Sequence, residues 1–212
     1  MNYATLTSDL QTYMLRTDKP YVTKLPDIIE QGIIRIYNNA KDIGFEIVED
    51  IILYNNNFVI KKPGNWRETI SIGLVDIDAG SITYLLPRTY EYCITYQPTV
   101  ATVGTPKFYY DSARNANGTY RSWNVVPATN KNCQITVVYL GIPLFNEAHG
   151  TNFLTQRYPN LLLYSCLMEA SLFLNNEEAR NKYEMMFGKE LETINRMNVD
   201  RTTDRTIVRD KS

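Results

Sequence analysis

The sequence holds few of the residues that build most catalytic and metal sites. Its 212 residues include one histidine, His149, and three cysteines, Cys93, Cys133 and Cys166. The cysteines are odd in number, far apart and each set in an apolar pattern, so we expect buried thiols and no disulfide framework or zinc site. His149 lies in a loop beside Glu147 with no nucleophile at a readable spacing, and we expect it on the surface.

An excess of one charge and a long apolar run are both lacking. Lys and Arg number 22 against 23 Asp and Glu, a net charge of -1, so we expect no tight binding of nucleic acid. Apolar runs, such as that at 161–163, are far short of a membrane span, and we expect no membrane partner. Residues 1–6 show neither the basic start nor the apolar run of a signal peptide, which with the free thiols predicts a protein made in a reducing cytoplasm.

Motifs of the common enzyme classes are absent as well. There is no G-x-S-x-G elbow, no phosphate-binding Gly-rich loop and no H-E-x-x-H. Residues 76–80 begin like a calcium loop, but Pro87 stands where the bidentate Glu belongs, which favours a turn. Glu46, Glu49 and Asp50 could form a glycosidase pair only if the fold placed them across a cleft. We therefore expect no catalytic residue, no metal and no cofactor.

What the sequence does hold is helical periodicity at both ends. Apolar residues recur at spacing four over about 5–16 and again from Pro26 to Lys41, where the proline fits a first helical turn. Residues 158–174 are apolar nearly all round, so other elements should wrap this helix on several sides. The next helix, from Glu177 to about Met197, has a single stripe, formed by Tyr183, Phe187, Leu191 and Ile194.

Short β-type runs fill the middle of the chain. Turn residues separate them, among them 55–57, which are all Asn, and Asn117-Gly118, which predicts a hairpin. Residues 87–97 read as a short helix within this region, with Tyr90 and Ile94 facing inward. Helices, then strands, then helices indicate an α+β fold.

We therefore predict terminal α-helices packed as a bundle, with an inserted antiparallel β region that contains one short helix. The helical domain joins residues 1–43 to a hairpin at 151–198, and the β domain spans 44–142. An extended C-terminal arm, residues 199–212, follows the last helix. The sixteen tyrosines suit protein–protein contact, and they suit ordinary β-structure equally well.

The arm has no apolar stripe to bury. Its triplet Asp200-Arg201-Thr202 is echoed four residues on by Asp204-Arg205-Thr206, and Ile207-Val208 is its one adjacent aliphatic pair. One interpretation is a frayed terminus. The other is a segment that orders on a partner, with arginine forks on carboxylates and the aliphatic pair as an anchor.

Several segments, in order along most of the chain, resemble the head-to-tail adaptor (head completion) proteins of short-tailed bacteriophages. The strongest similarity lies in the C-terminal hairpin, and the β region is the least specific part. The segments that carry the resemblance are 25–35 (LPDIIEQGIIR), 87–91 (PRTYE), 104–109 (GTPKFY), 137–139 with 143–144 (VVY and PL), 152–154 (NFL), 158–164 (YPNLLLY) and 169–174 (EASLFL).

The resemblance implies a virion protein at the head–tail interface that forms a homo-oligomeric ring, a dodecamer, beneath the portal protein. Its other end would meet tail nozzle or tail fibre proteins, and double-stranded DNA would pass through without specific binding. The family supplies no catalytic residues. For the portal contact we name Arg201, Arg205, Ile207, Val208 and Arg209 in the arm. For tail-facing loops we name Asn55, Asn56, Asn57, Asn115, Asn117 and Gly118, because of their turn chemistry at strand ends.

Three alternatives remain at this point. The chain could be another tail-completion or nozzle subunit of a phage. It could be a carbohydrate-binding or hydrolytic α+β domain that uses Trp66 and Trp123 as sugar platforms, which would require exposed rings beside a carboxylate pair. It could also be a plain cytoplasmic binding module.

Overall fold

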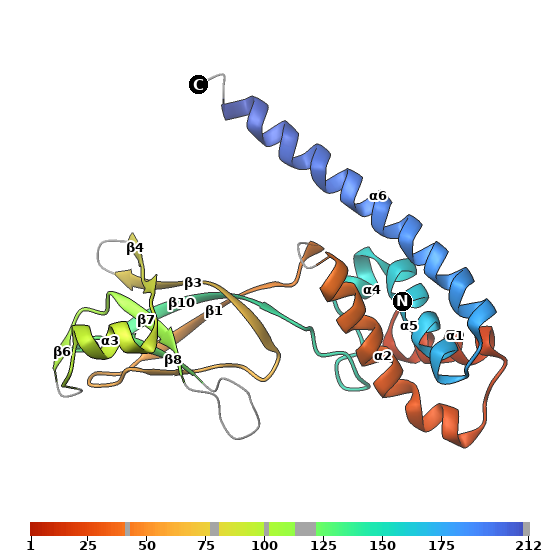
Figure 1. The fold of residues 1–212 in the computed structure, drawn as a ribbon, viewed down its shortest axis with the longest axis horizontal. Coiled ribbons are helices and arrows are strands. Elements are labelled where there is room, and N and C mark those ends of the chain that lie inside the picture. Colours follow the sequence, from red (N-terminus) through yellow and green to blue (C-terminus); the bar gives the residue numbers. More distant parts are fainter. Residues whose placement is uncertain (41–42, 77–80, 100–101, 113–121, 210–212) are drawn as a thin grey trace. The chain divides into compact units, whose positions relative to one another are not determined.

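The structure is a computed structural model that describes residues 1–40, 43–76, 81–99, 102–112 and 122–209 (Figure 1). For Asp76 and for residues 197–209 it describes the backbone alone. The chain forms two compact units. The helical unit comprises Met1–Phe45 with Ile142–Ser212, and the β unit comprises Glu46–Gly141. The predicted α+β class is confirmed.

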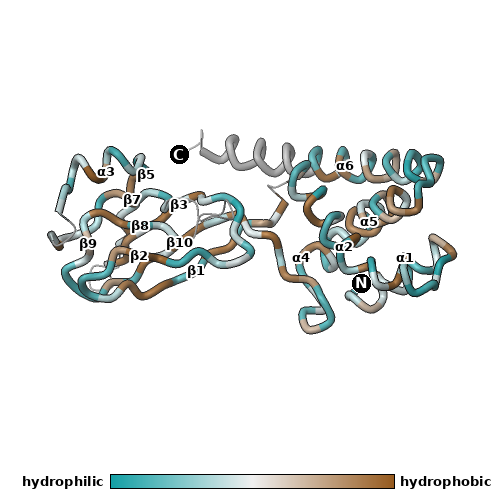
Figure 2. Tube along the Cα trace, turned by 60° about the horizontal axis from the view of Figure 1, so that its bottom comes forward, coloured by the Kyte–Doolittle hydropathy of each residue, from teal (hydrophilic) through white to brown (hydrophobic). Residues whose placement is uncertain are grey.

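Five helices form the helical unit, within the described residues, around the apolar α5. They are α1 (Tyr3–Met14), α2 (Lys19–Ala40), α4 (Phe153–Arg157), α5 (Pro159–Phe173) and α6 (Glu177–Arg209). α5 contacts each of the other four, and Leu161, Leu162, Cys166 and Leu167 on it are fully buried. The prediction that other elements wrap this helix is confirmed, and Figure 2 shows the hydrophobic colouring of α5 beside the mixed colouring of α6.

α2 begins earlier than its sequence pattern predicted. The helix starts at Lys19 and holds Pro26 in its interior, whereas the pattern placed Pro26 at its start. Pro20 accounts for the difference, because it takes the first-turn position, where a missing N–H has no helical partner to lose.

α2 and α5 approach closely at Gly32. A Cβ atom added there would lie 2.8 Å from Sγ of Cys166 and 3.2 Å from its backbone. Ser165 donates a hydrogen bond of 2.6 Å to the carbonyl of Gly32, and Nε of Arg35 donates one of 2.6 Å to Glu169. The absence of a side chain at Gly32 thus fixes how near the two helices lie.

α6 is longer than expected. Its stripe is confirmed, since Tyr183, Phe187 and Ile194 are buried, but the helix continues through residues 199–209. The extended arm predicted for residues 199–212 is therefore corrected to helix over 199–209; residues 210–212 lie outside the described residues. Residues 189–212 contain neither Gly nor Pro, and prolonging a helix costs far less than nucleating one.

Two four-stranded sheets form most of the β unit. The first has the order β1 (Glu46–Leu53), β10 (Cys133–Gly141), β3 (Trp66–Asp76), β4 (Ser81–Tyr84), and the second has β2 (Val59–Lys61), β8 (Ser122–Val126), β7 (Phe108–Asp111), β5 (Leu86–Pro87). The long pairings are antiparallel, as predicted. Two short ones are parallel: β5 with β7, and β6 (Val103–Gly104) with β9 (Ala128–Thr129).

The core of the β unit lies between the two sheets. Alternate residues of the longer strands point into it, as the pattern along β10 shows most clearly. The first sheet contributes residues such as Ile72, Ile135 and Val137, and the second contributes Ile60 and Trp123.

α3 (Tyr90–Tyr96) lies on the outer side of the second sheet, away from this core. Tyr109 of β7 faces the core, so its neighbours Phe108 and Tyr110 face outward, and both contact tyrosines of α3. Cys93 is the one buried residue of the helix. The prediction that Tyr90 and Ile94 face inward is wrong, because both are exposed.

Candidate functional site

The described residues contain no cluster of His, Cys, Asp and Glu side chains suited to binding a metal ion. No described helix is long and apolar enough to span a bilayer. His149 is exposed, as predicted, and its backbone N–H donates to Oδ1 of Asn146. Of the suspected calcium loop at 76–80, all but the backbone of Asp76 lies outside the described residues.

The suspected carboxylate pair does not form. Glu46, Glu49 and Asp50 follow one another on β1, which places Glu49 on the face opposite the other two. Glu46 and Asp50 share a face, but their Cα atoms lie about 13 Å apart along the strand, whereas the carboxyl groups of a glycosidase pair lie within roughly 9.5 Å of each other. Asp50 accepts a hydrogen bond of 2.6 Å from Thr136 instead.

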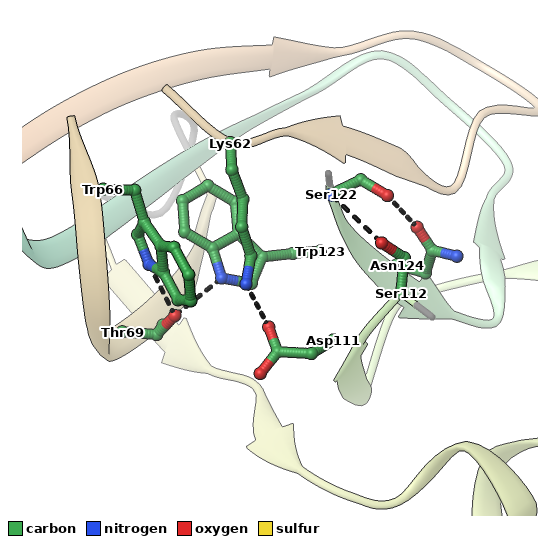
Figure 3. A network of polar contacts seen from close by, with 8 residues as sticks. All are labelled: Lys62, Trp66, Thr69, Asp111, Ser112, Ser122, Trp123 and Asn124. Carbon is green, nitrogen blue, oxygen red and sulfur yellow. Dashed lines mark hydrogen bonds and ion pairs between the residues drawn. The ribbon is translucent and has the colours of Figure 1, made fainter. Parts of the chain in front are cut away.

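The two tryptophans enclose a lysine within the β unit (Figure 3). The ammonium group of Lys62 lies 3.4 Å from the ring centre of Trp66 and 5.3 Å from that of Trp123. Asp111 on β7 pairs with it at 2.5 Å. The Lys62 side chain is only 2% exposed, and burial lowers its pKa while the Asp111 carboxylate opposes that shift.

Thr69 holds the two indole rings in position through hydrogen bonds. Its hydroxyl oxygen accepts hydrogen bonds from the indole N–H groups of Trp66, at 3.1 Å, and Trp123, at 2.7 Å (Figure 3). Trp123 is completely buried and Trp66 is half-buried, so neither ring is a free sugar platform. Lys62 stands directly before Pro63-Gly64, a turn signal beside which a lysine is ordinarily solvated. Its alternation with Ile60, which faces the core, was the signal that could have placed it inside.

The loop at 55–57 is tied to the turn at 129–132. The N–H of Asn55 donates to Oδ1 of Asn132 at 2.9 Å, and the N–H of Asn56 donates to the carbonyl of Thr129 at 2.8 Å. Asn56 has a φ of 62°, a left-handed conformation that Asn tolerates better than most residues. The other suggested loop, with Asn115, Asn117 and Gly118, lies outside the described residues.

An exposed aromatic surface on α3 escaped the sequence analysis. Tyr92 and Tyr96 stack nearly parallel and both meet Phe108 edge-on. The guanidinium of Arg88 lies over the rings of Tyr92 and Phe108, at 5.4 and 5.7 Å. The high tyrosine content was the only sequence signal for this surface. Without the fold, a tyrosine-rich binding surface could not be distinguished from the ordinary preference of tyrosine for β-strands.

The arm residues lie at the end of α6. Arg201, Arg205, Ile207, Val208 and Arg209 all belong to the helical stretch 199–209, so the structure places them on one continuous element with the bundle-packed part of α6.

Comparison with known proteins gives one clear result. A search of curated proteins found no match. The family described as the SU10 adaptor protein matches the chain over residues 1–209, nearly its whole length. The resemblance to phage adaptors seen in the sequence is thereby confirmed, and it makes the chain a structural adaptor of a phage virion: the chain belongs to the SU10 adaptor protein family.

Proposed function

We propose that this adaptor forms a homo-oligomeric ring beneath the portal protein of the capsid and joins the portal to the tail nozzle or tail fibre proteins. Membership of the adaptor family supports this assignment. Double-stranded DNA passes through the ring during ejection without specific binding, because a net charge of -1 offers no excess of basic residues to hold phosphates. A dodecamer is the ring size that the resemblance implies.

The observation that carries the portal contact is the form of α6. Its described side chains anchor the helix in the bundle through Tyr183, Phe187 and Ile194. The same helix runs on to Arg209 for 33 residues in all, about 50 Å. A helix anchored at one end can present its other end to a partner without the ordering cost of a free arm.

Charge and an aliphatic pair make the end of α6 suitable for this contact. Arg201, Arg205 and Arg209 supply guanidinium forks that match carboxylates, and Ile207-Val208 supplies an apolar anchor. The other partner, the tail, binds the loop formed by Asn55, Asn56 and Asn57 and the segment that contains Asn115, Asn117 and Gly118.

Deletion of residues 199–212 tests the portal contact. We expect the truncated chain to keep the helical circular dichroism and melting behaviour of a folded protein, because the buried stripe of α6 ends at Ile194. Its co-sedimentation with purified portal rings should be lost. The matched control is Arg180→Ala with Arg196→Ala, which removes two arginines from the described part of the same helix and should leave binding intact. Full binding by the truncated chain would refute the assignment.

A further inference from the structure

The β unit exposes an apolar face on its first sheet. The face, called the sheet face below, consists of residues whose side chains alternate away from the core: Val48, Asp50 and Ile52 on β1, Val75 on β3, and Ile82 and Tyr84 on β4. The register aligns Asp50 with Thr136, Gly73 and Tyr84, and Ile52 with Gln134, Val75 and Ile82. Val48, Ile52 and Tyr84 are 65%, 61% and 63% exposed. Exposed apolar side chains gathered on one face are typical of a surface that binds another protein.

A second apolar face covers the other side of the same unit. This α3 face consists of Leu86, Arg88, Tyr90, Tyr92, Tyr96 and Phe108. Leu86 pairs with Phe108 on the outer side of the second sheet, and six of the seven residues of α3 are exposed. Tyrosine and arginine are among the residue types enriched where proteins bind one another.

The two faces lie on opposite sides of the β unit. Between them stand the first sheet, the shared core and the second sheet, in that order. A protein with two different apolar binding faces on opposite sides associates head to tail. Such a contact forms a closed ring when the rotation that relates neighbouring subunits closes. In an isologous dimer the two copies would use the same face, and the other face of each copy would stay exposed.

The charges of the two faces complement each other. Asp50 is the charged residue at the aligned positions of the sheet face, none of which is Lys or Arg. The α3 face carries Arg88, whose guanidinium lies over the rings of Tyr92 and Phe108, and Glu91 is the one acid on α3 itself. Opposite charges at the centre of two apolar patches set the register of an interface and disfavour wrong pairings.

We propose that the sheet face of one copy packs against the α3 face of the next, with Asp50 close to Arg88 of its neighbour. This contact rests on the proposed ring and names the surface that closes it. The three tyrosines of α3 cover the aliphatic side chains of the sheet face, which explains why a short helix exposes them.

A charge swap tests the pairing in the full chain. Asp50→Arg and Arg88→Asp should each weaken association about tenfold, since each sets like charges opposite one another. The double variant should recover it. Lys131→Asp, a reversal at an exposed turn of the same unit, is the control and should associate like the unaltered chain. Association is measured by sedimentation velocity at high concentration and by the number of copies bound per purified portal ring.

Cross-linking gives an independent check of geometry. Asp50→Cys and Arg88→Cys together, treated with a short bismaleimide, should yield a ladder of oligomers, whereas either variant alone should yield none and their mixture only dimers. Cross-linking by Asp50→Cys alone would show a symmetric contact and overturn the proposal. So would single swaps that associate like the unaltered chain, a double swap that fails to recover, or no association in either assay. Self-association without portal binding would instead refute the proposed function and leave this interface standing.

Discussion

At the scale of single residues, the most informative group is the enclosed lysine. Burying an ammonium ion is costly, and the cost is tolerated when aromatic faces and a carboxylate surround it. Here Lys62 lies against Trp66 and pairs with Asp111. Asp111 itself is 42% exposed, so water can solvate the carboxylate if the lysine is removed, whereas the lysine has no such relief. The two halves of the pair are therefore unequal.

This inequality predicts an asymmetric mutational result. Asp111→Ala should lower the free energy of unfolding by about 1–2 kcal/mol, because it leaves a buried charge with less compensation. Lys62→Met keeps the volume and removes the charge, and should change stability by less than about 1 kcal/mol. In the Lys62→Met background, Asp111→Ala should cost little. Urea unfolding of the four proteins measures the coupling, and an equal cost of Asp111→Ala in both backgrounds would contradict this account.

At the scale of secondary-structure elements, the spacing of helices is set by glycine. Gly32 lets α2 approach α5 until a Cβ would meet Cys166 at 2.8 Å. A Cβ atom added at Gly188 on α6 would meet nothing within 4 Å. The two glycines sit in helices but serve different ends, since only the first is required by packing.

Matched substitutions should separate the two glycines. Gly32→Ala should destabilise the protein by about 1–3 kcal/mol, because overpacking outweighs the gain in helix propensity. Gly188→Ala should stabilise it by up to about 1 kcal/mol through that same gain. Thermal unfolding followed at 222 nm tests both, and a shift of the same sign in the two variants would show that packing at Gly32 does not matter.

Periodicity predicted the elements that bury a regular face. The apolar stripe of α6 and the apolar surface all round α5 could both be predicted from the sequence, because residues three or four positions apart share one face of a helix. The start of α2 was misplaced because Pro20 and Pro26 compete for one role. α3 was misread because its tyrosines look like core residues, and only the fold shows that Cys93 alone faces inward.

Long-range pairing was beyond the sequence. Neither the order β1-β10-β3-β4 nor the meeting of Lys62 with Asp111, which lie 49 residues apart, leaves a local trace. The exposed sheet face was equally hidden, because Val48 and Ile52 have the composition of core residues. The length of α6 was missed for the opposite reason: helix propagation needs no apolar stripe once the first turns are packed.

At the scale of the whole molecule, two cores account for stability. The helical unit buries residues such as Leu161 and Cys166, and the β unit buries Trp123 and Ile135. The chain passes from one unit to the other only at 45–46 and at 141–142. Each core therefore collects its contacts mainly within its own unit.

Calorimetry should resolve this division. We expect two unfolding transitions, with Asp111→Ala lowering the one that belongs to the β unit and Gly32→Ala lowering the other. For a unit of this size, each 1 kcal/mol should move the midpoint by roughly 4–8 °C. A single transition shifted alike by both variants would show that the units unfold together.

The pairing of β1 with β10 has a consequence for how such proteins diversify. Glu46, the first residue of the β unit, is aligned with Leu140, next to the last, and partners on adjacent strands have Cα atoms only about 5 Å apart. The excursion out of the helical unit thus leaves and returns at nearly one point. A different cassette with similarly joined ends could replace it without rebuilding any helix, so a phage lineage could exchange this module while the helical scaffold stays the same.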